Sequence, residues 1–342
     1  MVRAGPRDGE PIELSLIVPM YNEVAALDSF FARLIPILEA VSPRYEVIGV
    51  DDGSTDGTLA RLCALHLANR RIKLVALSRN FGKEAALSAG LDFARGAAVI
   101  PIDADLQDPP ELIADLVAAW RKGYQVVLAR RIERAGDSLA KRLSARLFYR
   151  LINRLSEVPI PEDVGDFRLL DRRVVEALRR MPERMRFMKG LFAWAGFRQT
   201  TVDYHRPARA AGRSKWSYWR LWNLALGGIT SFSTAPLRVW SYVGLTTAAS
   251  GLLYLGYVLA RTLVEGVDVP GYASLICILL LSTGLNMVGL GILGEYLGRV
   301  FMEVKQRPLY LVAQTVGFDA DVGEQTPARP SGTAVSLPAY MP

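Results

Sequence analysis

The chain has 342 residues, enough for one large domain and an appendage, with a net charge of +7 and 51% hydrophobic residues. This balance suits a soluble domain joined to membrane segments, whose basic residues face anionic lipid. The two cysteines have neither metal-ligand spacing nor an obvious disulfide partner, which argues against a cysteine metal site and indicates a reducing cytoplasm. The sequence contains no Walker loop and no internal repeat.

Apolar runs alternate with helical stretches from residue 14 to about residue 131. The runs predict buried strands at residues 14–18, 47–50, 74–77, 99–102 and 126–128, with helices at 25–38, 58–68, 83–94 and 111–121. Such alternation predicts an α/β fold with a mostly parallel sheet and helices on both faces. Ligands of these sheets bind beyond the carboxyl ends of the strands.

The fourth predicted strand runs into Asp103 and Asp105, and Gln107 follows two residues later. Side chains alternate along a strand, so both carboxylates point to the same side. Hard oxygen ligands at a strand end suit Mg²⁺ or Mn²⁺, which commonly bind a phosphate as well. The alternative is a helix cap, for which Asp108 alone is sufficient. We therefore expect an enzyme that handles a diphosphate.

The first two predicted strands also end in polar motifs. The first ends in VPMYNE, residues 18–23, and the second in DDGSTDGT, residues 51–58. Asp51 or Asp52 can accept hydrogen bonds from a base or a ribose, and Tyr21 can lie against a base. The alternative for each motif is a well-formed turn from strand to helix, with Ser54, Thr55 or Asp56 as the helix cap.

Two apolar segments, residues 239–263 and 272–293, each exceed the roughly 20 residues that a helix needs to cross a bilayer. The loop between them carries no Lys or Arg, whereas both flanks are basic. The positive-inside rule therefore places both flanks in the cytoplasm. The alternative, a buried hairpin of a soluble protein, does not explain this charge asymmetry. Small residues in the second segment could pack helices within or between chains, and we expect a homo-oligomer.

The motifs VPMYNE, DDGSTDGT and DADLQDP resemble those of inverting GT-A glycosyltransferases of family 2. Four later motifs resemble those of the polyprenyl-phosphate glycosyltransferases: SRNFGKE at 78–84, VGDFRLL at 164–170, GRSKW at 212–216 and GEYLGR at 294–299. Within that group the chain is most similar to bactoprenol glucosyltransferases, over about residues 13–311.

The resemblance implies a Rossmann-like GT-A domain, anchored by two C-terminal transmembrane helices in a bacterial inner membrane. The expected parts are a flexible N-terminus (1–13), the GT-A domain (14–210), interfacial amphipathic helices (211–238), transmembrane helices (239–263 and 272–293), a cytoplasmic juxtamembrane segment (294–313) and a disordered tail (314–342). The implied activity moves a hexose from a nucleotide diphosphate, with UDP-glucose favoured, to undecaprenyl phosphate. The catalytic domain is expected in the cytoplasm, and nucleic acid is not an expected partner.

Residue roles follow by matching motifs. Asp103, Asp105 and Gln107 would hold the metal, and the expected nucleotide-binding residues are Pro19, Tyr21, Glu23, Asp51, Asp52 and Asp103. Asp105 and Asp166 are the candidate catalytic residues, although Asp166 could instead be a capping or ion-paired acid. The candidate cations for the acceptor phosphate are Arg130, Arg131, Arg213 and Lys215. The alternative for Arg213 and Lys215 is contact with lipid headgroups.

Other functions share part of this sequence pattern. A processive polysaccharide synthase shares the core motifs, but it usually has more spans and a Gln-x-x-Arg-Trp motif, which this sequence lacks. A mannose synthase using GDP-mannose is a closer alternative. A non-catalytic membrane scaffold that binds nucleotides would be expected to lose its metal ligands, and all three are intact.

Overall fold

The computed structural model describes residues 11–132, 164–204 without 182, 185 and 187, 234–265 and 271–318. The chain divides into two compact units. The first comprises Met1–Gly123, Phe167–Val175 and Tyr310–Pro342, and the second comprises Tyr124–Asp166 and Glu176–Leu309. The first unit therefore combines segments from distant parts of the sequence, and the expected domain bounds, 14–210, stay a prediction.

The first unit alternates strands and helices as the sequence predicts. Its elements are β1 (Leu14–Met20), α1 (Val24–Val41), β2 (Tyr45–Asp51), α2 (Thr58–Ala68), β3 (Ile72–Leu77), α3 (Lys83–Phe93), β4 (Ala98–Pro101), the 3₁₀ turn η1 (Pro110–Leu112), α4 (Ile113–Arg121), most of β6 (Val164–Asp171), the start of α6 (Arg172–Arg180) and β8 (Val312–Val316).

The strands of this unit lie in the order β6-β4-β1-β2-β3-β8. Strand β1 is central and pairs in parallel with both β2 and β4, and β2 pairs in parallel with β3. The two outer strands, β6 and β8, run antiparallel to their neighbours. The ends of β1, β2, β3 and β4 therefore meet at one edge, which is the edge where the sequence places its polar motifs.

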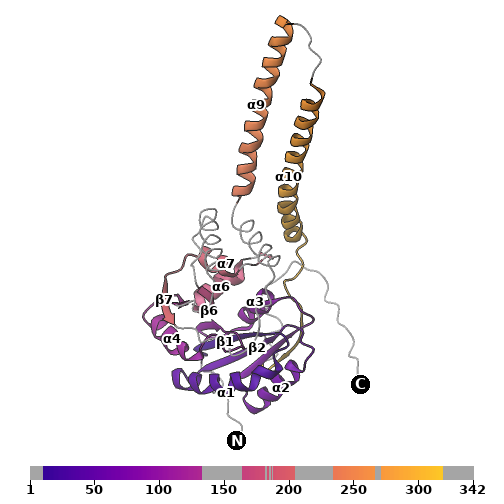
Figure 1. The fold of residues 1–342 in the computed structure, drawn as a ribbon. Helices are drawn as coiled ribbons and strands as arrows, with labels where there is room; N and C mark the ends of the chain where they lie inside the picture. Colours follow the sequence, from indigo (N-terminus) through magenta and orange to yellow (C-terminus); the bar gives the residue numbers. More distant parts are fainter. Residues whose placement is uncertain are drawn as a thin grey trace. The chain divides into compact units, whose positions relative to one another are not determined.

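Helices cover both faces of this sheet. Helix α1 buries Leu27, Phe30, Phe31, Leu34 and Leu38, the stripe expected of an amphipathic helix, and it lies with α2 and α4 on one face (Figure 1). Helix α3 covers the other face and approaches β1 closely. A Cβ atom on Gly90 would clash with the side chain of Ile17, so this approach requires glycine.

Strand β8, like β6, was not predicted from the sequence. It pairs antiparallel with β3, and the Tyr310 hydroxyl donates a hydrogen bond of 2.6 Å to Asp92. The ring of Phe318 lies 5.1 Å from that of Phe93. The disordered tail expected from residue 314 is thus wrong at its start, because the exposed edge of β3 offers backbone partners to this segment.

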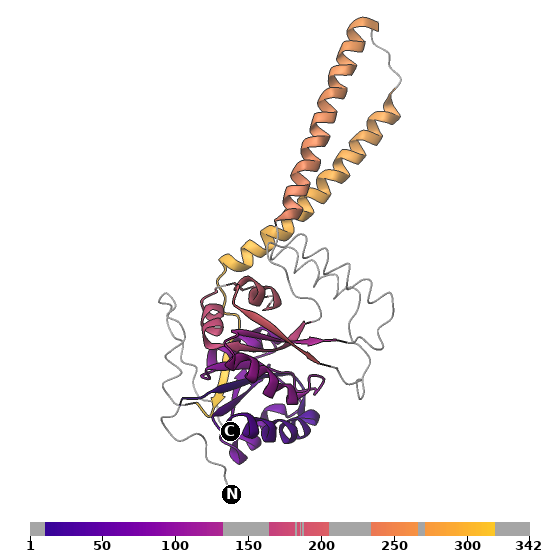
Figure 2. The same ribbon diagram turned by 90° about the vertical axis from the view of Figure 1, so that its left-hand side faces the viewer.

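The second unit contains β5 (Val126–Arg131), which pairs in parallel with β7 (Gln199–Tyr204). Its helices are the rest of α6, α7 (Met188–Trp194), α9 (Ala235–Glu265) and α10 (Tyr272–Val304). Figures 1 and 2 show α9 and α10 as two long neighbouring helices, and Trp240 of α9 packs against Gly289 of α10.

One helix in the described part of the chain is long and apolar enough to cross a membrane. It covers Pro236–Val264 of α9, with a mean hydropathy of 1.5 and none of its apolar window buried. The second expected span, 272–293, lies within α10 and stays a prediction at this point. Because α10 continues to Val304, the start of the expected juxtamembrane segment is helical.

Candidate active site

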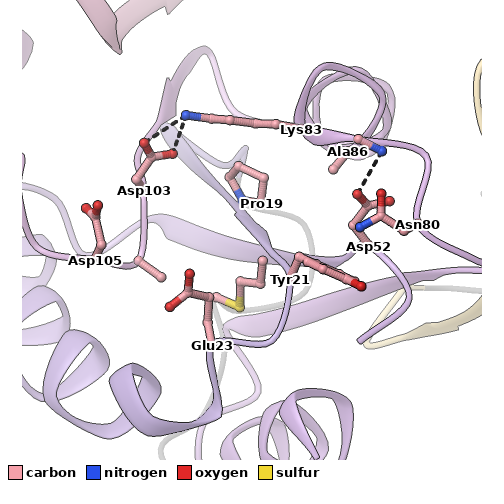
Figure 3. A pocket seen from close by; sticks show the side chains of 12 residues that line it. Pro19, Tyr21, Glu23, Asp52, Asn80, Lys83, Ala86, Asp103 and Asp105 are labelled. Carbon is pink, nitrogen blue, oxygen red and sulfur yellow. Dashed lines mark hydrogen bonds and ion pairs between the residues drawn. The ribbon is translucent and has the colours of Figure 1, made fainter. Parts of the chain in front are cut away.

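A pocket opens at the carboxyl edge of the parallel strands in the first unit (Figure 3). The ends of β1, β2 and β4 and the loop from β3 to α3 supply its walls. The lining residues are Pro19, Met20, Tyr21, Glu23, Asp52, Asn80, Gly82, Lys83, Ala86, Asp103, Ala104 and Asp105. The structure therefore brings together six of the sequence-predicted site residues: Pro19, Tyr21, Glu23, Asp52, Asp103 and Asp105.

The buried carboxylate of Asp52 holds the loop between β3 and α3. Its two oxygens accept hydrogen bonds from the backbone N–H groups of Phe81 at 2.7 Å and Gly82 at 2.9 Å. Burial raises the pKa of Asp52, the Asp51 charge acts in the same direction, and these two N–H groups oppose the shift. Gly53 has a φ of 70°, and a Cβ atom there would clash with the backbone at Arg79. The acid and the glycine together fix the loop that carries Lys83.

A second set of hydrogen bonds joins the ends of β1 and β2. Asn22 has a left-handed φ of 56°; its backbone N–H donates to Ser54 Oγ, and its side-chain oxygen accepts from the N–H of Thr55. Asp56 accepts from the backbone N–H of Val24 at 3.1 Å, which is the first residue of α1. Asp56 therefore helps to cap α1 as well as to order its own turn, a role across the sheet that local sequence does not reveal.

The two carboxylates that follow β4 have separate partners. The Nζ atom of Lys83 lies 2.7 Å from one oxygen of Asp103 and 2.8 Å from the other. Asp105 accepts hydrogen bonds from the backbone N–H of Gln107 at 3.1 Å and from its side-chain Nε2 at 2.6 Å. Between Asp105 and Gln107, Leu106 has a φ of 55°. This conformation is unusual for a branched residue and indicates that the surrounding structure holds the turn.

These residues suit a divalent cation that arrives with a phosphate. No group of three or more His, Cys, Asp or Glu side chains is placed to hold a metal within the described ranges. Mg²⁺, however, commonly uses one or two protein carboxylates and completes its shell with phosphate oxygens and water. Asp103 and Asp105 supply that number in the pocket. Gln107 contacts Asp105 here, so it orients this carboxylate, and its direct ligation of a metal stays a prediction.

The remaining predicted site residues lie elsewhere. Asp51 is buried; one of its oxygens accepts a hydrogen bond from the N–H of Ser54, and the other, Oδ1, has no hydrogen-bond partner among the described residues. Asp166 is half-buried on β6 in the second unit, where Arg130 and Arg131 end β5. Arg130 forms a bidentate ion pair with Asp203, at 2.6 and 2.8 Å.

Two of the predicted acceptor cations, Arg213 and Lys215, lie outside the described residues. Their roles, and those of Arg130, Arg131 and Asp166, stay predictions. Asn80, Gly82, Lys83 and Ala86 are pocket residues without a predicted role. For Asn80, Gly82 and Lys83 the available signal was the SRNFGKE motif at 78–84, because it follows the end of β3 at the same edge of the sheet, whereas Ala86 lies beyond this motif.

Parallel strands whose carboxyl ends carry acids, tight turns and a lysine define an α/β protein of the nucleotide-binding type. Comparison with protein families narrows this class. The model of glycosyl transferase family 2 matches residues 15–179, and the model of the GtrB C-terminal hairpin matches residues 235–300. The chain belongs to glycosyltransferase family 2, which confirms the family expected from the motifs and its GT-A-like mixed sheet.

The chain matches several curated relatives over nearly their whole length. An uncharacterized glycosyltransferase of Synechocystis sp. is 54% identical over 90% of this chain and 97% of its own. A prophage-derived bactoprenol glucosyl transferase of Shigella flexneri is 46% identical over 89% of this chain and 98% of its own. A prophage bactoprenol glucosyl transferase homolog of Escherichia coli is 45% identical over 88% and 98%.

Proposed function

We propose that this protein transfers glucose from UDP-glucose to a polyprenyl phosphate and forms a lipid-linked sugar. The observation that carries the proposal is the carboxylate-lined pocket at the strand ends of a family 2 chain. Relatives named bactoprenol glucosyl transferase, at 45–46% identity over most of the chain, favour glucose and a polyprenyl acceptor over the mannose alternative.

In this proposal the nucleotide lies against the first unit. Tyr21 is 47% exposed and lines the pocket, so its ring is accessible to a nucleobase. Asp51 lies behind the pocket lining, and its Oδ1 atom, which has no partner among the described residues, would suit an N–H or O–H donor of the base or ribose, because a buried acceptor without a partner is costly. Asp103, Asp105 and Lys83 supply the charges for the diphosphate end.

The same pocket suits Mg²⁺ or Mn²⁺, held by Asp103 and Asp105 with Gln107 beside them. When bound, such an ion acts as a Lewis acid that stabilises the leaving diphosphate. The chain's own contribution is to position the two carboxylates: Gln107 orients Asp105, and Asp103 follows the end of β4 in the pocket.

The transfer itself needs no strong base. A polyprenyl phosphate is already anionic at neutral pH, so one of its oxygens can attack the anomeric carbon directly. That C–O bond forms as the bond to the UDP oxygen breaks, and UDP leaves on the opposite face with inversion. Asp166 would orient the acceptor, and the candidate cations Arg130, Arg131, Arg213 and Lys215 would compensate its charge.

The acceptor's lipid tail explains the C-terminal helices in this proposal. Helix α9 has 31 residues, or about 46 Å at 1.5 Å per residue, and α10 has 33. Both exceed the roughly 30 Å of a bilayer's hydrocarbon core. We therefore propose that α9 and α10 cross the membrane as a hairpin. Arg238 and Arg299 would then lie towards the cytoplasmic side, with the catalytic domain.

The test is transfer by the purified full chain in liposomes that contain undecaprenyl phosphate. UDP-glucose, UDP-galactose, UDP-N-acetylglucosamine and GDP-mannose are supplied in turn, and both released nucleotide and extractable glycolipid are measured. We expect glycolipid from UDP-glucose alone, only with the lipid and a divalent ion present, and none with Asp103→Asn. Preferential use of GDP-mannose, or equal UDP release without lipid, would contradict the proposal.

A further inference from the structure

Lys83 and Asp103 form a direct ion pair inside the pocket that we propose for the nucleotide sugar, called the donor pocket below (Figure 3). The ammonium lies 2.7 Å and 2.8 Å from the two carboxylate oxygens, so it covers the side of Asp103 on which another cation would bind. The two side chains are 45% and 35% exposed, and both line the pocket. The pair is therefore accessible to an incoming ligand.

The backbone beneath Lys83 is fixed, which limits how the pair can respond. Asp52 binds the N–H groups of Phe81 and Gly82, and Lys83 is the first residue of α3. A movement of the ammonium must therefore come from rotation of its four-carbon side chain. Such a stem allows the charge to move several ångströms without disturbing the loop.

We propose that Lys83 acts as a resident cation that covers Asp103 until a metal and nucleotide bind together. This inference rests on the proposed function, because it assumes that Asp103 takes a divalent ion in that state. The ammonium and a divalent ion repel each other and compete for the same oxygens. The lysine must therefore turn away when a metal binds, and the nearest new anion is the diphosphate that comes with it.

The binding of the metal and the binding of the nucleoside diphosphate should therefore be coupled. A metal that binds alone must displace Lys83 and brings no anion for the ammonium to contact in exchange. A metal that binds with a nucleoside diphosphate releases Lys83 to a phosphate, where it makes a charge-assisted hydrogen bond. The wild-type protein should thus bind metal weakly alone and much more tightly with nucleotide. The alternative is a surface ion pair with little influence on either ligand.

The experiment measures Mn²⁺ binding to the detergent-solubilised full chain by electron paramagnetic resonance of free Mn²⁺, with and without UDP. Lys83→Met removes the charge at similar volume, and Lys122→Met, at an exposed site outside the pocket lining, is the matched control. Asp103→Asn reports the loss of the metal ligand. No acceptor lipid is present, so the result does not depend on sugar or acceptor identity.

We expect Lys83→Met to bind Mn²⁺ alone at least about threefold more tightly than the wild type. Its affinity for UDP in the presence of Mn²⁺ should fall roughly ten- to a hundredfold, as for a lost charge-assisted hydrogen bond. Lys122→Met should match the wild type in both measurements. Unchanged or weaker Mn²⁺ binding by Lys83→Met would overturn the inference, even if glucose transfer to lipid is confirmed. Equally, the expected Mn²⁺ result would stand if the sugar proved to be different.

Discussion

The proposed donor pocket and the end of strand β5 hold their charged side chains in different ways. In the pocket, the buried acid Asp52 is fixed by the backbone N–H groups of Phe81 and Gly82 in the neighbouring loop. At the end of β5, the described partner of Arg130 is another exposed side chain, Asp203. The first arrangement is rigid and suits a nucleotide of fixed shape. The second can exchange its partner, which suits a phosphate on a mobile lipid.

Removing a pocket carboxylate should have the largest effect on transfer. Asp105→Ala deletes a proposed metal ligand, and we expect transfer to fall roughly a hundred- to ten-thousandfold, since metal stabilisation of a leaving group is worth several kcal/mol. Because Asp105 is exposed, the unfolding midpoint should stay unchanged. Transfer rates and thermal unfolding are measured on the same preparation. Near-normal turnover with Mg²⁺ present would contradict the metal assignment.

The pocket acids also show what the sequence could reveal. Asp103 and Asp105 follow a short buried strand, and strand geometry alone places both at its carboxyl end. Most bounds of the helices and strands likewise follow from local sequence, and α2 begins and ends at the residues that its apolar pattern predicts. The Lys83–Asp103 pair depends instead on how the loop after β3 lies against the end of β4, which no local pattern specifies.

Strand β8 was missed for a similar physical reason. Its residues, Val312–Val316, are mostly exposed, so they lack the alternating burial that identifies a strand in sequence. Its pairing partner, β3, lies more than 200 residues earlier, and only the folded sheet edge brings the two together. The residues proposed for the acceptor phosphate are less predictable still, since Arg130 and Asp203 meet through the pairing of β5 with β7.

Removing β8 would test whether the rigidity of the donor pocket extends to the sheet edge. A chain ending after Leu309 loses the β8 ladder and the hydrogen bond from Ser78 N–H to the Leu311 carbonyl. Ser78 begins the loop that carries Lys83. We expect the unfolding midpoint to fall by roughly 5 °C or more, as for the loss of several backbone hydrogen bonds, together with weaker UDP binding.

The matched control for this deletion ends after Phe318, so it keeps β8 and removes only residues 319–342. It should unfold and bind UDP like the full chain. Both proteins are compared by differential scanning fluorimetry and calorimetry. If the two truncated chains behave alike, β8 does not support the pocket and the rigid region is smaller than the hydrogen bonds indicate.

Asp52→Asn tests the rigid loop directly. An amide can accept only through its oxygen, so one of the N–H groups of Phe81 and Gly82 would face an NH₂ group. We expect UDP affinity to fall about tenfold and the unfolding free energy to fall by about 1–3 kcal/mol at neutral pH. Calorimetric UDP titration and urea unfolding provide the two values. Unchanged UDP affinity in a stably folded variant would show that the loop does not need this anchor.

The same variant has a pH signature. Burial raises the pKa of Asp52 in the folded chain, so the folded state binds this proton more tightly than the unfolded state. The stability of the wild type relative to Asp52→Asn should therefore decrease as the pH rises through that raised pKa. Urea unfolding across the acid range measures the difference. A difference that grows over this range would mean that the hydrogen bonds from Phe81 and Gly82 outweigh burial.

The smallest effect is expected at the end of β5, where Asp203→Asn removes the partner of Arg130. The pair is exposed, so transfer efficiency towards polyprenyl phosphate should change by less than about fivefold, and UDP affinity should not change. The Arg130 hydrogen bond lowers the pKa of Asp203, so any stabilisation from the pair is present at neutral pH and disappears as the pH falls through that lowered value.

Arg130→Ala is the companion variant. If Arg130 binds the acceptor, its removal should weaken lipid use about tenfold or more with donor affinity unchanged. Equal, minor effects of both variants on lipid use would assign the pair to the strand end alone, and a loss of UDP affinity in Arg130→Ala would move the arginine to the donor side.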